Sequence, residues 1–334
     1  MKKVSVLILS YNLEKYIREA VLSALNQNGV SHDELEIVIV EDGSADNSRG
    51  VIKGLIREYP GAVKLIDLGR NTGIMPAAME GLKHLTGKYV CLLDADDVWH
   101  EDKLSEVIPC LDAGYDLVLH EGEFVDSSGN FLRSAGCRVR DEDIAGRIRT
   151  FNGGAPLGSC VSFRKSSLDM GLLSAVYDKF KAKGIERNLH QDFSMVHNLL
   201  SRKGIRVKCV RKNLYKYRIH EGNTSQHSDF EDAGKLRKTY DDWMAGIQFA
   251  IETYRLTGIF NEDKSIDIGF RKFLYHKNLT FREKPLIKLW SDYIFLLRNR
   301  AFSSSNEKLR EALYPFFYRL SPKLRGFIRR RAQL

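Results

Sequence analysis

Short apolar runs and longer amphipathic segments alternate along the first 120 residues of the chain. The short runs are brief enough to be buried β-strands, and they fall at 4–9, 36–40, 63–68, 89–93 and 116–120. The longer segments carry apolar residues at helical spacing and predict helices over 13–27, 48–59, 75–86 and 101–112. Strands that alternate with helices form a mostly parallel sheet whose two faces are covered, so the pattern predicts a Rossmann-like α/β fold.

The regular alternation ends after residue 120. Residues 124–132 (FVDSSGNFL) predict a hairpin with Asp126 to Gly129 in its turn. A polar stretch over 221–235 predicts a boundary, and beyond it the chain predicts helices with aromatic-rich faces. We therefore expect a main domain over residues 1–225 and a helical region over 226–334.

The composition is that of a folded protein without a membrane-spanning helix. Hydrophobic residues make up 43% of the 334 positions and charged residues 28%, as in ordinary globular proteins. No apolar run approaches the roughly 18 residues of a spanning helix, and the apolar start breaks at Ser10 and Asn12, so we expect no signal peptide. The five cysteines are odd in number and never spaced CxxC, which favours reduced thiols in the cytoplasm over disulfides or a zinc site.

The excess positive charge lies at the end of the chain. The net charge is +9, and residues 281–334, with 13 Lys and Arg against 4 Asp and Glu, account for all of it. Within this segment apolar residues follow helical spacing among basic ones: Leu286, Leu289, Trp290, Tyr293, Ile294 and Leu297. Such a segment either binds an anionic membrane surface or packs its apolar face on the main domain. Nucleic acid is a less favoured partner, because no recognisable binding motif accompanies the arginines and aromatics.

Polar residues follow three of the predicted strands, at Ser10–Asn12, Glu41–Ser44 and Asp94–Asp97. The carboxyl ends of parallel strands meet at one edge of a sheet, where such folds bind ligands. Asp94, Asp96 and Asp97 repel one another unless a cation lies between them, and oxygen ligands select Mg²⁺ or Mn²⁺. The cluster is therefore suited to holding a nucleotide diphosphate through a metal. The alternative is a helix N-terminus, where aspartates are favoured by the dipole.

Four stretches occur in one order, SVLILSYNLEKYIREAVLSALNQ, EIVIVEDGSADNS, GRNTGIMPAAMEGL and YVCLLDADD. Together they resemble the family 2 glycosyltransferases, which are inverting enzymes with the GT-A fold. The resemblance covers about residues 1–225, and the last hundred residues show no comparable match. It implies transfer of a sugar from a nucleotide-diphosphate donor to a hydroxyl of a glycan or lipid-linked acceptor, with Mn²⁺ or Mg²⁺ as the metal. A bacterial-type enzyme of this kind would build surface polysaccharide at the cytoplasmic face of the membrane.

The resemblance also assigns roles to residues by position. Asp94, Ala95 and Asp96 match the DxD motif, in which the two aspartates hold the metal and Asp96 contacts it directly. Ser10 and Tyr11 lie where the nucleobase binds, and Asp42 matches the carboxylate that accepts from uracil. An acceptor at this position selects uracil over cytosine, whose ring nitrogen is itself an acceptor. UDP is therefore the expected nucleotide, and TDP and GDP are less favoured.

Further matches follow in the next loops. Asn71 and Gly73 match a donor-binding loop, although Ala78 and Met79 stand where Arg-Asn is common, which leaves the donor sugar open. Arg218 and His220 resemble a segment that closes over the diphosphate, where His220 either completes the metal's coordination or contacts phosphate. A lone histidine is more often structural, and that interpretation stays open. The loop over 151–160 (FNGGAPLGSC) is expected near the acceptor.

Asp192 is the predicted catalytic base. It follows Gln191 at the start of an apolar-periodic helix, where an aspartate is also favoured for purely structural reasons. The resemblance aligns it with the aspartate of a Glu-Asp pair, with Gln191 in place of the glutamate. A carboxylate of ordinary pKa, about 3.9, is ionised at neutral pH and ready to accept a proton from the acceptor hydroxyl.

Other functions have weaker support. A non-catalytic carbohydrate-binding or assembly module on the same fold is the main alternative. A sugar-phosphate nucleotidyltransferase would need a glycine-rich opening after the first strand, which is missing here. No GxGxxG is present, and GLKHLTGKY (81–89) does not have the P-loop spacing, so dinucleotide oxidoreductases and P-loop kinases are disfavoured.

Overall fold

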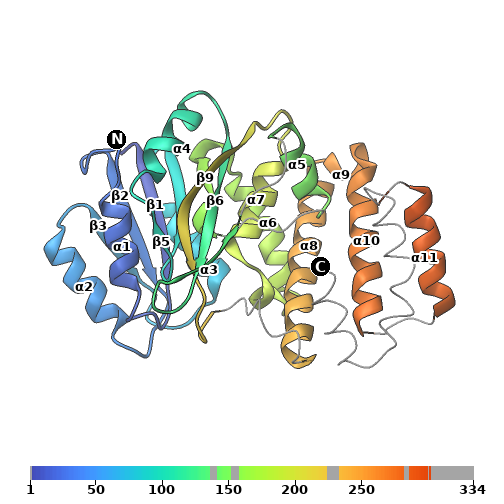
Figure 1. Cartoon of the computed structure of the whole chain (residues 1–334), viewed down its shortest axis with the longest axis horizontal. Helices are drawn as coiled ribbons and strands as arrows, with labels where there is room; N and C mark the ends of the chain where they lie inside the picture. Colours follow the sequence, from blue (N-terminus) through green and yellow to red (C-terminus); the bar gives the residue numbers. More distant parts are fainter. Residues whose placement is uncertain are drawn as a thin grey trace.

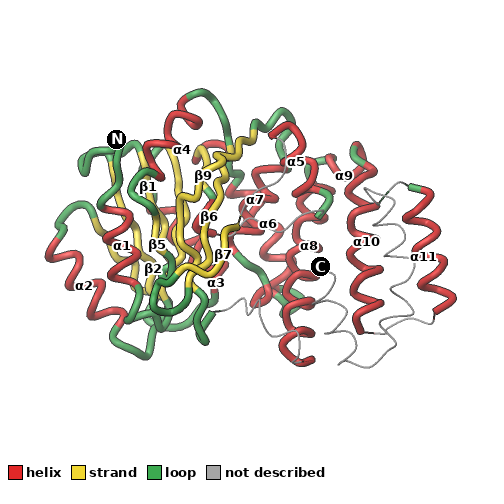
Figure 2. Tube along the Cα trace, in the orientation of Figure 1, coloured by secondary structure: helices red, strands yellow, loops and turns green. Residues whose placement is uncertain are grey.

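The computed structural model describes residues 2–135, 141–151, 158–223, 233–281, 286–299 and 301. One end of the molecule is an α/β body built on a twisted sheet, and the other end is a row of helices (Figures 1 and 2). The chain runs from the sheet end, in blue, to the helical end, in orange and red (Figure 1).

The first half of the sheet is parallel, as the apolar runs predict. Its strands are β1 (Val4–Ser10), β2 (Leu35–Glu41), β3 (Val63–Asp67) and β4 (Tyr89–Asp94), in the order β3-β2-β1-β4. The register pairs Ser10 with Glu41, Leu9 with Asp94 and Glu41 with Asp67, so the four strands end in step. This alignment brings the loops after β1, β2 and β4 to one edge of the sheet.

The second half of the sheet is mixed rather than parallel. It contains β8 (Ser162–Arg164), β6 (Leu117–Val125), β9 (Val207–Arg218), β5 (Val98–Trp99) and β7 (Phe131–Ala135). Only the β6–β9 pair is parallel among these strands, since β8, β7 and β5 pair antiparallel with their neighbours. The β6–β7 pair is the predicted hairpin, and the Asp126 carboxylate stabilises its turn by accepting from the Ser128 and Asn130 backbone N–H groups.

The predicted helices form with small changes at their ends. They are α1 (Ile17–Leu25), α2 (Ser48–Glu58), α3 (Ile74–His84) and α4 (Lys103–Asp112). The first is shorter than the sequence pattern predicts, because the loop before α2 captures the backbone just before it. The Asn12, Leu13 and Glu14 N–H groups donate to the side chains of Ser44, Ser48 and Asp46 instead of joining a helix.

The later part of the described chain is mainly helical. Its elements are α5 (Asp141–Arg149), the 3₁₀ turns η1 (Gly158–Cys160), η2 (Lys165–Ser167) and η3 (Glu186–Asn188), α6 (Met170–Lys181), α7 (Gln191–Leu200), α8 (Ala233–Leu256), α9 (Ile259–Glu262), α10 (Lys264–Phe281) and α11 (Leu286–Arg298). None of the helices in the described ranges combines the length and apolar character that crossing a membrane requires.

Two hydrophobic clusters organise the described residues. The main core includes the sheet and continues into α8, where Phe249 and Tyr254 are fully buried. The main core therefore extends across the predicted boundary at 225/226. A smaller cluster holds α10 against α11 and consists of Tyr275, Leu289, Tyr293 and Leu296.

Candidate active site

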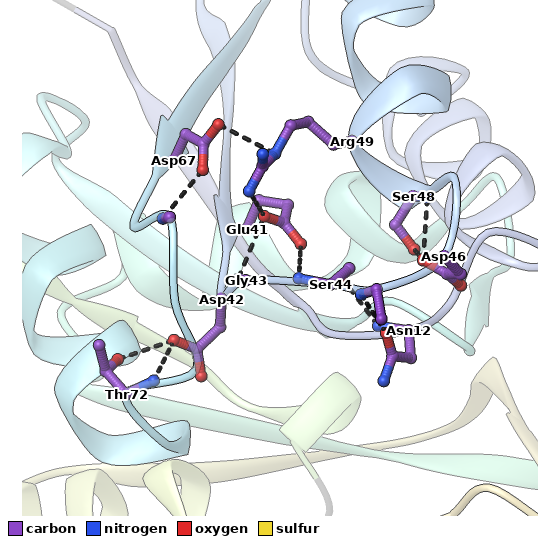
Figure 3. Close-up of polar contacts among 12 residues, drawn as sticks. Asn12, Glu41, Asp42, Gly43, Ser44, Asp46, Ser48, Arg49, Asp67 and Thr72 are labelled. Atoms are coloured by element: carbon purple, nitrogen blue, oxygen red, sulfur yellow. Dashed lines mark hydrogen bonds and ion pairs between the residues drawn. The ribbon is translucent and has the colours of Figure 1, made fainter.

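The loops after β1 and β2 interlock at the edge of the sheet. Asn12, in the left-handed conformation with φ of 56°, donates from its backbone N–H to Ser44 Oγ at 2.9 Å and accepts from the Ala45 N–H at 2.8 Å (Figure 3). Tyr11 stays 46% exposed beside this fixed loop, and the Ser10 hydroxyl is buried with no hydrogen-bond partner in the described structure. An exposed aromatic ring on a rigid loop is suited to stacking on a planar base.

Asp42 joins the end of β2 to the loop before α3. Its Oδ1 accepts from the Thr72 N–H at 2.7 Å and hydroxyl at 2.8 Å (Figure 3). Its Oδ2 accepts from the Gly73 N–H at 2.9 Å. Asn71, the other loop residue predicted to bind the donor, is exposed beside them. A carboxylate oxygen with one donor retains a second acceptor position, so Oδ2 can still accept from a ring N–H.

Glu41 is a buried acid whose structural role the sequence does not reveal. It accepts from the Gly43 N–H at 3.1 Å, the Ser44 N–H at 2.6 Å and Arg49 at 3.1 Å, while Arg49 also contacts Asp67 at 3.0 Å (Figure 3). Burial raises the pKa of Glu41, but the hydrogen bonds from Ser44, Arg49 and Gly43 outweigh burial and lower it. Glu41 thus holds the turn that presents Asp42.

The acids after β4 divide into two kinds. The Asp97 N–H donates to the Asp94 carbonyl at 3.0 Å and closes a turn. Asp97 is buried, and its two carboxylate oxygens accept from the Ser159 hydroxyl at 2.5 Å and the Arg218 N–H at 3.0 Å. Asp94 and Asp96, the predicted metal ligands, remain partly exposed on either side of the buried Ala95. Asp97 therefore fixes the turn, and the other two carboxylates are available to a ligand.

Asp192 lies at the same site as Asp94. The helix α7 begins at Gln191, as the sequence predicts, and the Gln191 amide donates to Asp94 Oδ1 at 3.3 Å. The pKa of Asp94 is raised well above its ordinary value by burial and by the charges of Asp96 and Asp192. Burial also raises the pKa of Asp192, although His190 and backbone N–H groups oppose the shift. The structure therefore brings the predicted base and the DxD motif together.

Arg218 supports the turn in this structure rather than facing an open site. Its side chain is buried, with Nε donating to the Asp96 carbonyl at 3.0 Å, Nη1 to the Ser127 carbonyl at 3.2 Å and Nη2 to Glu19 at 2.7 Å. Each of the three guanidinium nitrogens therefore has a protein partner. The contact of Arg218 with a diphosphate stays a prediction.

His220 contacts Asp96 from the segment that follows β9. Its Nδ1 accepts from the Gly222 N–H at 3.1 Å, so the neutral ring carries its proton on Nε2, which donates to Asp96 at 3.0 Å. The Tyr16 ring packs on the imidazole with centroids 4.8 Å apart. In this arrangement His220 orients the Asp96 carboxylate, which is a predicted metal ligand, and the predicted place of His220 in the metal's own coordination stays a prediction.

The donor set suits a hard cation that shares its coordination with a substrate. Among the described residues no group of three or more His, Cys, Asp or Glu side chains is arranged to hold a metal alone. Magnesium-type ions are commonly held by one or two carboxylates, with substrate phosphates and water completing the shell. Asp94 and Asp96 provide two such carboxylates, and the raised pKa of Asp94 records negative charge that a cation would offset.

The chain matches the model of the glycosyl transferase family 2 over residues 5–171. It belongs to that family. It is 31% identical over 288 residues to an uncharacterized glycosyltransferase of Nostoc sp., covering 84% of this chain and 81% of that protein. It is 36% identical over 108 residues to the poly(ribitol-phosphate) β-N-acetylglucosaminyltransferase TarP of Staphylococcus aureus, covering 32% of each. The chain spans about half or less of the other curated relatives that it matches.

A solved structure shares the fold. The crystal structure of S. aureus TarS 1–349 in complex with UDP is similar with a TM-score of 0.57 at 18% identity, covering 93% of this chain and 86% of that one. The predicted GT-A fold with a helical extension is therefore confirmed, and this family 2 member is an enzyme of the glycosyltransferase class.

Sequence reasoning missed the residues that hold the site in place. Ser159 and Lys103 are buried, and they fix the turn after β4 and the backbone of η1. Ser159 lies in a segment without a regular apolar pattern. Lys103 is the first residue of a helix, where a lysine is ordinarily expected at the surface. One sequence feature pointed toward this region: Trp99 lies two residues after Asp97, and its indole donates to the Ser159 carbonyl at 3.2 Å.

Proposed function

We propose that this glycosyltransferase uses a UDP-sugar as its donor and Mn²⁺ or Mg²⁺ as its metal. The anomeric configuration of the transferred sugar is inverted. The acceptor is a hydroxyl of a glycan or lipid-linked molecule in cell-surface polysaccharide synthesis, and the sugar is a hexose or an N-acetylhexosamine. The observation that carries this proposal is the hydrogen bond from Gln191 to Asp94, which places the next residue, Asp192, beside the two carboxylates of the DxD motif. The names of TarP and of the UDP complex of TarS support the substrate classes.

The donor's nucleoside is bound at the interlocked loops. Tyr11 stacks on the base, and Asp42 Oδ2 accepts from the ring N–H of uracil while the Thr72 and Gly73 backbone groups hold the carboxylate still. A carboxylate with fixed orientation discriminates against cytosine, because two acceptors would face each other.

The diphosphate lies toward Asp94 and Asp96. These two carboxylates would hold the metal, which supplies positive charge to the departing diphosphate when bound. His220 keeps Asp96 in place by donating to its Oδ2, and Asp97 fixes the turn without contacting the ion.

Asp192 acts as the general base. Inversion requires a proton acceptor on the face of the sugar opposite the leaving diphosphate, and it takes the proton of the acceptor hydroxyl as the new bond forms. Burial raises the pKa of Asp192, and a carboxylate of higher pKa is a stronger base in its ionised form. The Phe193 N–H donates to Asp192 Oδ1 at 2.7 Å and orients the carboxylate.

Turnover of a panel of UDP-sugars, followed by UDP release and mass spectrometry of the product, tests the proposal. Asp192→Asn keeps the shape but cannot accept the proton, so the rate should fall about 10²- to 10⁴-fold. Asp178→Asn, an exposed aspartate on α6, is the matched control and should retain full activity. No turnover with any donor, together with binding of glycans, would favour the non-catalytic carbohydrate-binding module instead.

The helical end is the surface that we propose for an anionic membrane at the cytoplasmic face. Ile294, Phe295 and Leu297 on α11 each expose more than a third of their surface, beside the exposed Lys288 and Arg298. The remainder of the predicted basic segment, 282–285, 300 and 302–334, lies outside the described residues. Apolar side chains ringed by basic ones suit an anionic headgroup layer.

Flotation with phosphatidylglycerol vesicles checks this surface. Phe295→Ser with Leu297→Ser should reduce the bound fraction. Phe131→Ser, at an even more exposed apolar residue on β7, should leave it unchanged. Equal binding by all three proteins, or by a chain that ends at residue 280, would contradict membrane contact through this end.

A further inference from the structure

Two buried basic side chains contact the backbone around the acidic turn. Among the described residues, Lys103 and Arg218 are the lysine and arginine side chains that are buried. Arg218 donates to the Asp96 carbonyl, and Lys103 Nζ donates to the Ser159 carbonyl at 3.0 Å while lying 3.4 Å above the Trp99 ring centroid. Burying an ammonium without a carboxylate partner is costly, so the burial of Lys103 next to the site suggests a structural role there.

Ser159 connects Lys103 to the turn. Its carbonyl accepts from both Lys103 and the Trp99 indole, which fixes the backbone of η1. Its hydroxyl then bridges the two ends of the turn, accepting from the Asp94 N–H at 3.0 Å and donating to Asp97 Oδ2 at 2.5 Å. One side chain thereby sets the distance between the first and last residues of the acidic turn.

Gly158, the residue before Ser159, lies against both Asp94 and Asp192. A Cβ placed on Gly158 would lie 2.7 Å from Asp94 Oδ2, so the backbone of η1 lies directly against this carboxylate. The Gly158 backbone also contributes a hydrogen bond that lowers the pKa of Asp192. A shift of η1 would therefore change the position of the donor-side carboxylate and of the base together.

We propose that Ser159 is a positioning residue for sugar transfer, which acts by holding Asp94 and Asp96 at the spacing that a diphosphate-bound divalent cation requires. Metal ligands tolerate displacements of only about 0.2 Å, and partners that orient them typically contribute about 10- to 100-fold in affinity. This inference rests on the proposed metal-dependent function. It adds a residue that contacts neither the metal nor the sugar.

The matched pair Ser159→Ala and Ser162→Ala tests the role. Both serines are buried and lie three positions apart, but Ser162 faces the Cys91 thiol instead of the acidic turn. The measurement is Mn²⁺ affinity in the presence of UDP, by electron paramagnetic resonance of free Mn²⁺, together with the melting temperature. We expect Ser159→Ala to bind Mn²⁺ about 10- to 100-fold more weakly, and Ser162→Ala to bind it as the wild type does.

Kinetics separate positioning from a general loss of structure. With Ser159→Ala, the Mn²⁺ concentration for half-maximal rate should rise, and kcat at saturating Mn²⁺ should largely recover. If the alanine variant does not fold, Ser159→Cys, which fills the space with a slightly larger side chain and is a weak donor, should show a smaller shift in the same direction. Unchanged Mn²⁺ affinity in a folded Ser159 variant, or equal loss in Ser162→Ala, overturns the inference.

The wild-type protein separates this inference from the proposed function. If wild-type UDP binding and turnover are independent of Mn²⁺, the metal part of the proposed function is wrong. In that case kcat is measured without added metal for Ser159→Ala and Ser162→Ala. A lower kcat in Ser159→Ala alone supports a positioning role for Ser159, and an unchanged kcat contradicts it.

Discussion

At the scale of single residues, the buried acids of this protein differ in how many donors surround them. Glu36 is fully buried in β2 and accepts from the Ser5 hydroxyl at 2.5 Å, from Lys64 at 2.7 Å and from the Thr86 N–H at 2.5 Å. Burial alone would raise the pKa of Glu36, but these bonds lower it to about 2. Asp94 has one such donor and a raised pKa. Glu36 therefore has its charge satisfied within the fold, whereas Asp94 keeps acceptor positions that a ligand can use.

Glu36 should make stability depend on pH in a defined window. Its pKa of about 2 in the folded state lies below the ordinary 4.5, so its contribution is complete above pH 4.5 and is lost as the pH falls toward 2. Glu36→Gln should lower the free energy of unfolding at pH 7 by about 3 kcal/mol, with a smaller difference at pH 3. Urea unfolding at both pH values measures this. The exposed Glu101→Gln is the control, and an equal loss at both pH values would contradict the assignment.

At the scale of secondary-structure elements, α4 begins with a charge in an unfavourable place. Burial lowers the pKa of Lys103 from 10.5 to about 7, against the opposing effects of nearby thiols and carboxylates. Below pH 7 the helix start therefore holds a buried ammonium at a cost to stability. The cost falls as the pH rises from 7 to 10.5, because the unfolded chain binds the proton more tightly in that range.

Lys103→Met should therefore not be less stable than the wild type at pH 6. Its free energy of unfolding should be higher by up to about 4 kcal/mol. The difference should shrink by pH 9, where the wild-type lysine is largely neutral when folded. The Ser159 carbonyl keeps the Trp99 indole as a donor in this variant. Thermal unfolding at the two pH values measures the effect, with the exposed Lys83→Met on α3 as control. A variant less stable than the wild type at pH 6 would show that the ammonium stabilises the fold.

The elements also show which features the sequence could reveal. The strands that end at Ser10, Glu41 and Asp94 are continuous apolar runs, so their ends and the acids beyond them follow from local pattern. The long β9 was not predicted, because VKCVRKNLYKYR mixes charged and apolar residues without a clear period. Ser159 could not be found locally either, since its partners Asp94 and Lys103 lie 65 and 56 residues away in the chain.

At the scale of the whole molecule, the helical end is joined to the sheet through α8. Gly246 on α8 packs on Phe193, the residue after the predicted base, and a Cβ at Gly246 would lie 3.1 Å from that ring. The α10–α11 pair lies farther out, side by side beyond α8 (Figure 1), and has its own small cluster. A pair of helices with a separate core opens more easily than a central sheet.

Hydrogen exchange should therefore be faster in α10 and α11 than in β1 and β2. Leu289→Ala removes a buried side chain of the outer cluster and should weaken that pair by about 2 to 5 kcal/mol. Exchange should accelerate in these two helices alone, and turnover of a soluble acceptor should be unchanged. Leu7→Ala in the main core is the comparison, because it should accelerate exchange throughout the sheet. Equal acceleration everywhere after Leu289→Ala would mean that the molecule unfolds as one unit.

The bonds that close the acidic turn have a consequence for biosynthesis. Asp97 is tied to Ser159 and Arg218, which follow it by 62 and 121 residues. During translation the carboxylates leave the ribosome long before either anchor exists, so a nascent chain carries loose, mutually repelling acids. The turn can close only after Arg218 has been made, and binding of the proposed ion would then report that this half of the sheet has folded.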